Sequence, residues 1–194
     1  DIQSILVRSA SDLISLENPN YQFVAARLLL FALQKQVFGT KWEDGKDIYP
    51  RLYDMVNKNI DIGVYTKEIH DYYTEEEFDI CNSYVRHSRD FDFTYAGLQQ
   101  IVDKYLVQDR STGQLYETPQ DMYMMIAATL FADYPLKTRM SYVKKYYDAI
   151  SQHKINIPTP VMAGVRTPIR QFASCVLVDS DDTLPSIFSS DMAI

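Results

Sequence analysis

The chain has 194 residues, of which 46% are hydrophobic and 23% charged, and its formal net charge is −7. This is the composition of an ordinary globular protein, long enough to bury a core without disulfide support. The negative charge argues against a nucleic-acid partner, because binding phosphates requires a basic face. Two cysteines far apart in the sequence are typical of a reducing cytoplasm, and no apolar run is long enough to span a bilayer.

Apolar residues recur at helical spacing through the first half of the chain. The Asn-Pro-Asn run at 18–20 interrupts the first helix, and Gly39 is placed to end the second. WEDGKDIYP, residues 42–50, is predicted to form a loop. These signals predict helices over about 2–14, 21–38, 51–60 and 94–103 and one that begins after Thr74.

The run YTEEEF, residues 73–78, carries the signature of a capping box. The Thr74 hydroxyl is placed to accept a hydrogen bond from the Glu77 N–H, and the Glu77 carboxylate is placed to accept one from the Thr74 N–H. Glutamates in a first helical turn also complement the helix dipole. The acidic run is therefore a helix start in its simplest interpretation.

The pattern changes after residue 104, where two short β-prone runs flank Gly113. Residues 105–107 and 114–117 are predicted to form a β-hairpin. The next helix is expected over 119–132, with Pro119 at its first position, and it should lie deep because it is apolar on most sides. A further helix is expected over about 136–152.

The composition shifts again at residue 155, where three prolines occur in the next sixteen residues. Because proline fixes φ, residues 155–170 are predicted to form an ordered, extended connection. QFASCVLV, residues 171–178, then reads as a strand that is apolar on both faces and therefore central in a covered sheet. A lone strand leaves its backbone unpaired, so it is expected to join another chain or a missing segment. A loop leading into a helix follows.

Most motifs that carry chemistry are absent from the sequence. His70, His87 and His153 have no spacing typical of metal ligands, and there is no phosphate-binding loop or dinucleotide fingerprint. His70 beside Asp71 reads as a solvated pair at a helix end. Cys81 reads as a packing residue, since nearby acidic groups raise the pKa of a thiol.

Cys175 admits two interpretations from the residues alone. A single cysteine in an apolar strand is most often a small core residue. Against this, Ser174 places a polar side chain in a strand with no obvious water-facing side, and an acidic loop begins where the strand ends. The carboxyl ends of strands are where α/β folds place ligands. The sequence pattern therefore leaves two alternatives open for Cys175, a packing residue of the core and a reactive thiol.

Several blocks of the sequence resemble one known family. YTEEEF, KYLVQDRSTGQLYE, the tyrosine-rich run after DYP, and above all PTPVMAGVRTPIRQFASCVL at 158–177 resemble the N-terminal region of the class I ribonucleotide reductase large (alpha) subunit. The resemblance implies a mainly α fold. An N-terminal helical domain with one β-hairpin (1–154) would precede the first strand and effector loop of a ten-stranded α/β barrel (155–194). The rest of that barrel is expected from another chain or a missing segment.

The resemblance also implies a reaction and a set of site residues. The family reduces ribonucleoside diphosphates by thiyl-radical chemistry, and a pair of cysteines supplies two electrons and becomes a disulfide. Cys175 is similar to one member of that pair. The implied substrate-binding residues are Thr159, Ala173 and Ser174, and the implied contacts to a dNTP or ATP effector are Asp182, Leu184 and Ile187.

The implied partners are the remainder of the alpha subunit, a second alpha subunit, and a radical-generating, metal-containing beta subunit. Thioredoxin or glutaredoxin would re-reduce the cysteine pair, and this chain itself would bind no metal or other cofactor. Segments typical of the family's other catalytic residues do not occur here, so activity is expected only with a complement. A truncated chain, a proteolytic fragment and one half of a split subunit remain alternatives. The rival interpretation is a non-catalytic helical interaction module in which the tyrosines anchor partners.

Overall fold

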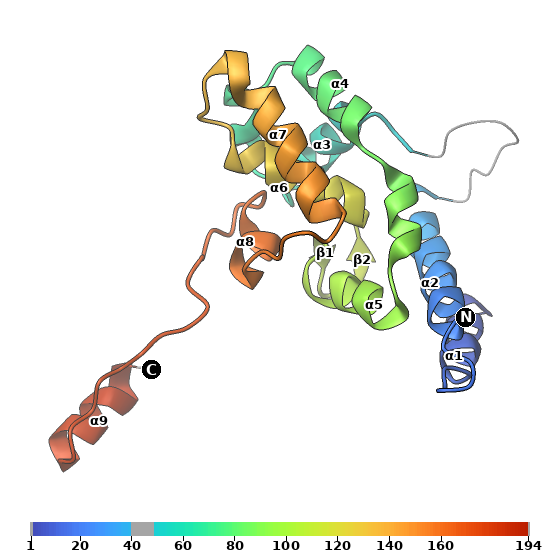
Figure 1. The fold of residues 1–194 in the computed structure, drawn as a ribbon. Helices are drawn as coiled ribbons and strands as arrows, with labels where there is room; N and C mark the ends of the chain where they lie inside the picture. Colours follow the sequence, from blue (N-terminus) through green and yellow to red (C-terminus); the bar gives the residue numbers. More distant parts are fainter. Residues whose placement is uncertain (1, 40–48, 194) are drawn as a thin grey trace, which may run out of the picture.

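A computed structural model describes residues 2–39 and 49–193 (Figure 1). Its helices and strands follow in chain order: α1 (Ile2–Ser11), α2 (Tyr21–Phe38), α3 (Leu52–Asp61), η1 (Lys67–Asp71), α4 (Glu75–Tyr84), η2 (His87–Asp92), α5 (Tyr95–Lys104), β1 (Gln108–Asp109), β2 (Gln114–Leu115), α6 (Pro119–Leu130), α7 (Leu136–Ser151), α8 (Thr159–Gly164) and α9 (Leu184–Ala193). η1 and η2 are short 3-10 helices. The described chain is thus mainly helical with one small hairpin, as predicted, and the loop predicted around 42–50 falls largely outside the described residues.

The predicted end of α2 and the predicted start of α4 agree with the structure. Gly39 follows the end of α2 with φ of 85°, a conformation that glycine adopts without the strain that a Cβ would bring. The capping box before α4 is present, with Thr74 and Glu77 each accepting from the other's backbone N–H. The first helix is shorter than predicted, because α1 ends at Ser11.

Helix α6 is the centre of the core, as its composition predicted. Every residue from Pro119 to Ala128 is buried, and α7 packs along it. The 3-10 helix η2 also contacts α6, and the burial of ten consecutive residues shows that α6 is covered on all sides over this stretch. A helix that is apolar on all sides is stable in water only in such a position.

The β-hairpin is real, but the prediction of its first strand was wrong. The strand pairs Gln108 with Leu115 and Asp109 with Gln114, instead of beginning at Tyr105. The N–H groups of Tyr105 and Leu106 donate to the Ile101 carbonyl of α5, so neither N–H is available to pair with the second strand. The turn is set locally, since the Asp109 carboxylate accepts from the Ser111 N–H at 2.8 Å.

The prediction of an extended connection over 155–170 was also wrong in part, because residues 159–164 form the helix α8. Pro160 occupies the first turn of this helix, where the fixed φ of proline fits a helix as well as an extended chain. A helix of six residues is too short to show a periodic apolar pattern in the sequence.

After Thr167 the chain first runs along the surface of the helical body, where Arg170 pairs with Glu68 of η1, and then leaves it. Residues 171–180 have no regular secondary structure and are exposed, and α9 follows, standing apart from the other helices (Figure 1). No described residue pairs with 171–178 in a ladder, so the strand expected there stays a prediction. Within the described part of the chain, none of the helices has the length and apolar character needed to cross a membrane.

Candidate functional site

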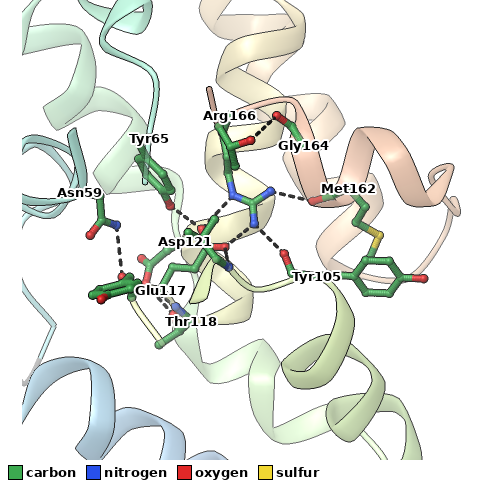
Figure 2. Close-up of polar contacts among 12 residues, drawn as sticks. Asn59, Tyr65, Tyr105, Glu117, Thr118, Asp121, Met162, Gly164 and Arg166 are labelled. Atoms are coloured by element: carbon green, nitrogen blue, oxygen red, sulfur yellow. Dashed lines mark hydrogen bonds and ion pairs between the residues drawn. The ribbon is translucent and has the colours of Figure 1, made fainter. Parts of the chain in front are cut away.

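A buried ion pair joins α8 to the end of the hairpin. The Arg166 guanidinium contacts the Glu117 carboxylate through two groups, Nε to Oε2 at 2.9 Å and Nη2 to Oε1, and both side chains are 0% exposed. This two-pronged geometry is the strongest that arginine forms with a carboxylate. Figure 2 shows the pair at the junction of the hairpin, α6 and α8.

The Glu117 carboxylate is fully satisfied by its neighbours. Besides Arg166, it accepts a hydrogen bond from the Val107 N–H at 2.7 Å and another from the Tyr65 hydroxyl. A carboxylate has about four lone-pair sites, and all four are occupied. A buried charge with every site filled fixes the orientation of each group that contacts it.

Burial and charge oppose each other at Arg166. Burial alone would lower the pKa of the guanidinium, but the adjacent Glu117 carboxylate raises it above its ordinary value. At Tyr65 the two act together, since burial and the Glu117 charge both raise the pKa of the phenol well above its usual range. Tyr65 therefore stays a neutral hydrogen-bond donor and Arg166 stays charged.

Arg166 also binds three stretches of backbone. Its Nη1 donates to the Met162 carbonyl of α8 at 2.6 Å, and its Nη2 donates to the Tyr105 carbonyl at the end of α5 at 2.8 Å. Its own carbonyl accepts from the Thr66 N–H at 3.0 Å. One residue thus joins the segment before η1, the end of α5 and α8 (Figure 2).

The sequence patterns did not identify this cluster. Arg166, Glu117 and Tyr65 were not among the predicted site residues, although Arg166 lies inside the segment that carried the resemblance. One signal in the sequence could have indicated the cluster. A single arginine follows the apolar residues 161–165, and an arginine that is buried among apolar residues needs a carboxylate as its partner.

Thr159 is the predicted substrate residue that the body of the fold positions. It is the first residue of α8, and its Oγ1 lies 3.3 Å from the Tyr105 hydroxyl. The Thr159 side chain is exposed, so its hydroxyl is accessible to solvent next to the Arg166–Glu117 ion pair that holds α8.

Ala173, Ser174 and Cys175 lie on the exposed stretch beyond the junction. The Ser174 hydroxyl is 3.9 Å from the Cys175 sulfur, so these two side chains lie together. No contact in the described residues joins them to Thr159. Cys175 is exposed in this structure, and both interpretations of its thiol stay predictions.

The three predicted effector residues cluster at the start of α9. Asp182 precedes the helix, Leu184 is its first residue, and the Ile187 N–H donates to the Thr183 carbonyl at 2.9 Å. Leu184 is 69% exposed and Ile187 47%, so both present apolar surface to solvent. The Ser190 hydroxyl donates to the Asp179 carbonyl at 3.2 Å, which holds α9 against the stretch that follows Cys175.

Cys81 is buried in α4, as predicted, and its surroundings are those of an inert thiol. Burial, with a smaller contribution from the Glu77 carboxylate, raises the pKa of the Cys81 thiol to about 12. His70 is exposed, as predicted, and its Nε2 lies 2.8 Å from Asn57 Oδ1. In the described ranges, no group of three or more histidine, cysteine, aspartate or glutamate side chains has a geometry that could hold a metal ion.

The sequence of the chain is similar to a known family of proteins. Residues 91–170 match the sequence model of the ribonucleotide reductase all-alpha domain. The whole chain is 47% identical to the ribonucleoside-diphosphate reductase 1 subunit alpha of Escherichia coli, and likewise 47% identical to the subunit alpha of Haemophilus influenzae. It is 44% identical to the ribonucleoside-diphosphate reductase subunit alpha of phage T4.

In each of these three relatives the alignment covers 100% of this chain but only 25% of the relative. The chain therefore spans about a quarter of the length of the curated relatives it matches. Over that quarter the chain is similar to ribonucleoside-diphosphate reductase alpha subunits, and its residues 91–170 resemble the ribonucleotide reductase all-alpha domain.

Proposed function

We propose that this chain serves as the N-terminal part of an alpha subunit that reduces ribonucleoside diphosphates to deoxyribonucleoside diphosphates. The observation that carries the proposal is identity of 43–47% along the whole chain to seven relatives that bear this subunit's name. The position of Cys175 supports it, because a thiol that exchanges electrons has to be accessible.

In this proposal Cys175 is one of two electron-donating thiols. Two thiols lose two protons and two electrons and form one disulfide, while the 2′-hydroxyl of the ribonucleotide leaves as water and a hydrogen takes its place. The initiating radical comes from a metal-containing beta subunit, and thioredoxin or glutaredoxin reduces the disulfide again. The sequence holds one other cysteine, Cys81, which is buried in α4, so the second thiol comes from the remainder of the alpha subunit.

The other predicted residues receive roles at the same end of the molecule. Thr159, Ala173 and Ser174 would contact the nucleoside diphosphate. Asp182, Leu184 and Ile187 would contact a dNTP or ATP effector, with the Asp182 carboxylate accepting from a sugar hydroxyl and the exposed leucine and isoleucine packing on the base. Because Ser190 bonds to the Asp179 carbonyl, α9 and the Cys175 segment would move together, which would link the effector to the substrate pocket.

The exposed segment 171–178 supports the proposed ten-stranded barrel. Val176 is 79% exposed and Leu177 is 97% exposed, in a stretch whose backbone has no ladder partner in the described chain. Apolar side chains and unpaired backbone groups together are stabilised by adding the segment to a sheet. The neighbouring strands would come from the rest of the alpha subunit, and the exposed side of α9 would face a second alpha subunit.

The test uses the complete alpha subunit, assembled with its beta subunit and a dithiol reductant. Cys175→Ser is expected to abolish multiple turnover while effector binding stays unchanged. Cys81→Ala is the matched control, since it removes the other thiol of this chain and should keep turnover. Unchanged turnover in Cys175→Ser would reject the redox role.

The second candidate function is a non-catalytic helical interaction module. Surface aromatic side chains favour it, since Tyr134 and Tyr142 are 42% and 44% exposed and pack with Phe131 at centroid distances of 4.8 and 5.7 Å. An interaction module would stay monodisperse alone, whereas a reductase segment should aggregate through 171–193 until its complement is added. Light scattering of the purified chain, with and without the rest of the alpha subunit, separates the two.

A further inference from the structure

Tyr105 and Thr159 form a contact between two hydroxyl groups that lie far apart in the sequence. The Tyr105 hydroxyl lies 3.3 Å from Thr159 Oγ1 across a separation of 54 residues. Tyr105 caps the end of α5, and Thr159 begins α8. The contact therefore depends on how the end of α5 and the start of α8 are placed relative to each other.

One guanidinium fixes both of those elements. Arg166 donates to the Tyr105 carbonyl at 2.8 Å and to the Met162 carbonyl of α8 at 2.6 Å. Arg166 is held in turn by the fully satisfied Glu117 carboxylate. The backbones under the two hydroxyls are thus held by a buried ion pair and do not depend on the hydroxyl contact itself (Figure 2).

The two side chains differ in exposure. Tyr105 is half-buried and borders a cavity of about 360 Å³, which Phe93, Tyr123, His153 and Met162 also line. Packing of the ring restricts its rotamers, so the phenolic oxygen has a defined position. Thr159 is exposed, so the other side of its hydroxyl is accessible to a ligand.

We infer that Tyr105 is a positioning residue for the Thr159 hydroxyl. This inference rests on the proposed function, in which Thr159 contacts the nucleoside diphosphate. The Tyr105 hydroxyl donates its proton to Thr159 Oγ1, and this leaves the single Thr159 proton to be donated to a substrate oxygen. A hydroxyl has one proton and two lone pairs, so accepting from Tyr105 fixes the direction in which Thr159 donates.

An anionic acceptor strengthens this chain of hydrogen bonds. When Thr159 donates to a phosphate oxygen, its own oxygen becomes a better acceptor for the Tyr105 proton. The present separation of 3.3 Å is longer than the usual O–H···O distance of about 2.8 Å. Hydrogen bonds of this kind shorten when a ligand completes the site, and the Tyr105 contact is expected to do so.

The experiment compares Tyr105→Phe with the unchanged complete alpha subunit, assembled with its beta subunit. Tyr105→Phe removes only the hydroxyl. The dissociation constant of a nucleoside diphosphate and its KM are each expected to rise about three- to tenfold, as loss of one hydrogen bond predicts, with kcat within about twofold. The thermal midpoint should not change, because Arg166 still holds both elements.

A double-mutant cycle tests the route through Thr159. Thr159→Val alone should raise the dissociation constant, and Tyr105→Phe should add no more than about twofold in the Thr159→Val background. Fully additive effects, or an unchanged dissociation constant in Tyr105→Phe, would overturn the inference. Tyr123→Phe is the matched control, since it removes a hydroxyl from the same cavity lining. An equal rise in the control would also overturn the inference, because general packing would then be the cause.

The two proposals fail differently. If Cys175→Ser keeps multiple turnover, the proposed redox function is rejected whatever Tyr105 does. If Cys175→Ser abolishes turnover and Tyr105→Phe leaves nucleotide binding unchanged, only the positioning role is rejected.

Discussion

The helical body and the segment after Thr167 have similar apolar content and opposite surroundings. In α6, Met122, Met124 and Ile126 are each 0% exposed. In the segment after Thr167, Val176 is 79% and Leu177 97% exposed. Apolar composition therefore does not decide burial by itself; a side chain is buried only where the chain supplies a surface to cover it.

The same contrast holds for polar groups. In the body, the charges of Arg166 and Glu117 are completely enclosed and paired, whereas Arg170 pairs with Glu68 at a surface where the two side chains are 39% and 53% exposed. Ion pairs of these two kinds contribute differently to stability, since breaking a buried pair leaves an uncompensated charge. The two ion pairs therefore respond differently to the loss of their arginine.

The largest expected difference between the two regions is in the rates at which their cysteines react. Because burial raises the pKa of the Cys81 thiol to about 12, Cys81 is almost entirely protonated at pH 8. Burial in α4 slows its reaction further. Cys175, which is exposed, should be alkylated within minutes by iodoacetamide, while Cys81 should react only after unfolding. Mass spectrometry of peptides after timed labelling measures both rates, and equal rates would contradict the contrast.

Arg166→Met should give the next largest effect. It leaves the buried Glu117 carboxylate without its partner, so the free energy of unfolding of the body should fall by about 3–5 kcal/mol. Arg170→Met is the matched control, and the exposed pair that it breaks should cost about 0–1 kcal/mol. Urea unfolding followed by circular dichroism measures both. Similar losses in the two variants would show that burial does not separate these ion pairs.

Asp90 in η2 should make the stability of the helical body depend on pH. It is 1% exposed, and its Oδ1 accepts from Gln120 Nε2 at 2.8 Å. Among the described residues, its Oδ2 has no hydrogen-bond partner. Burial raises the pKa of the Asp90 carboxyl well above its usual value, and the neighbouring Asp121 adds to the shift. At pH values between the unfolded and the folded pKa, the folded protein keeps a proton on Asp90 that the unfolded chain has lost.

The sign of the pH effect follows from that proton. The contribution of Asp90 to stability is fully present below the unfolded pKa of 3.8 and is lost as pH rises through the raised folded pKa. Within that window the free energy of unfolding should fall by about 1.4 kcal/mol per pH unit relative to Asp90→Asn, which cannot ionise. Urea unfolding of both proteins across pH 4–8 measures the difference. A difference that does not vary with pH would exclude a protonated Asp90.

Local signals predicted most of the fold. Gly39 ended α2, Thr74 and Glu77 formed the capping box, and the apolar run after Pro119 became the central helix. Each of these depends on groups within three or four residues of one another. The predicted start of the hairpin failed where a competing contact was equally local, since Tyr105 and Leu106 bond back to Ile101.

The site was predicted only in part. The resemblance selected Thr159 and Cys175, and the structure leaves both accessible. It did not select Arg166, Glu117 or Tyr105, whose importance comes from contacts between distant segments. Nor did proline content distinguish a helix from an extended chain at α8, because the φ that proline imposes fits both.

The sequence by itself determined which stretches are helical, where several of them begin and end, and which family the chain resembles. Only the tertiary structure decided that Glu117 and Arg166 meet across 49 residues, and Tyr105 and Thr159 across 54. The physical reason is the range of the forces involved. Helix periodicity and capping act between neighbours in the chain, whereas a buried ion pair forms only after the packing of several elements has removed water from both partners.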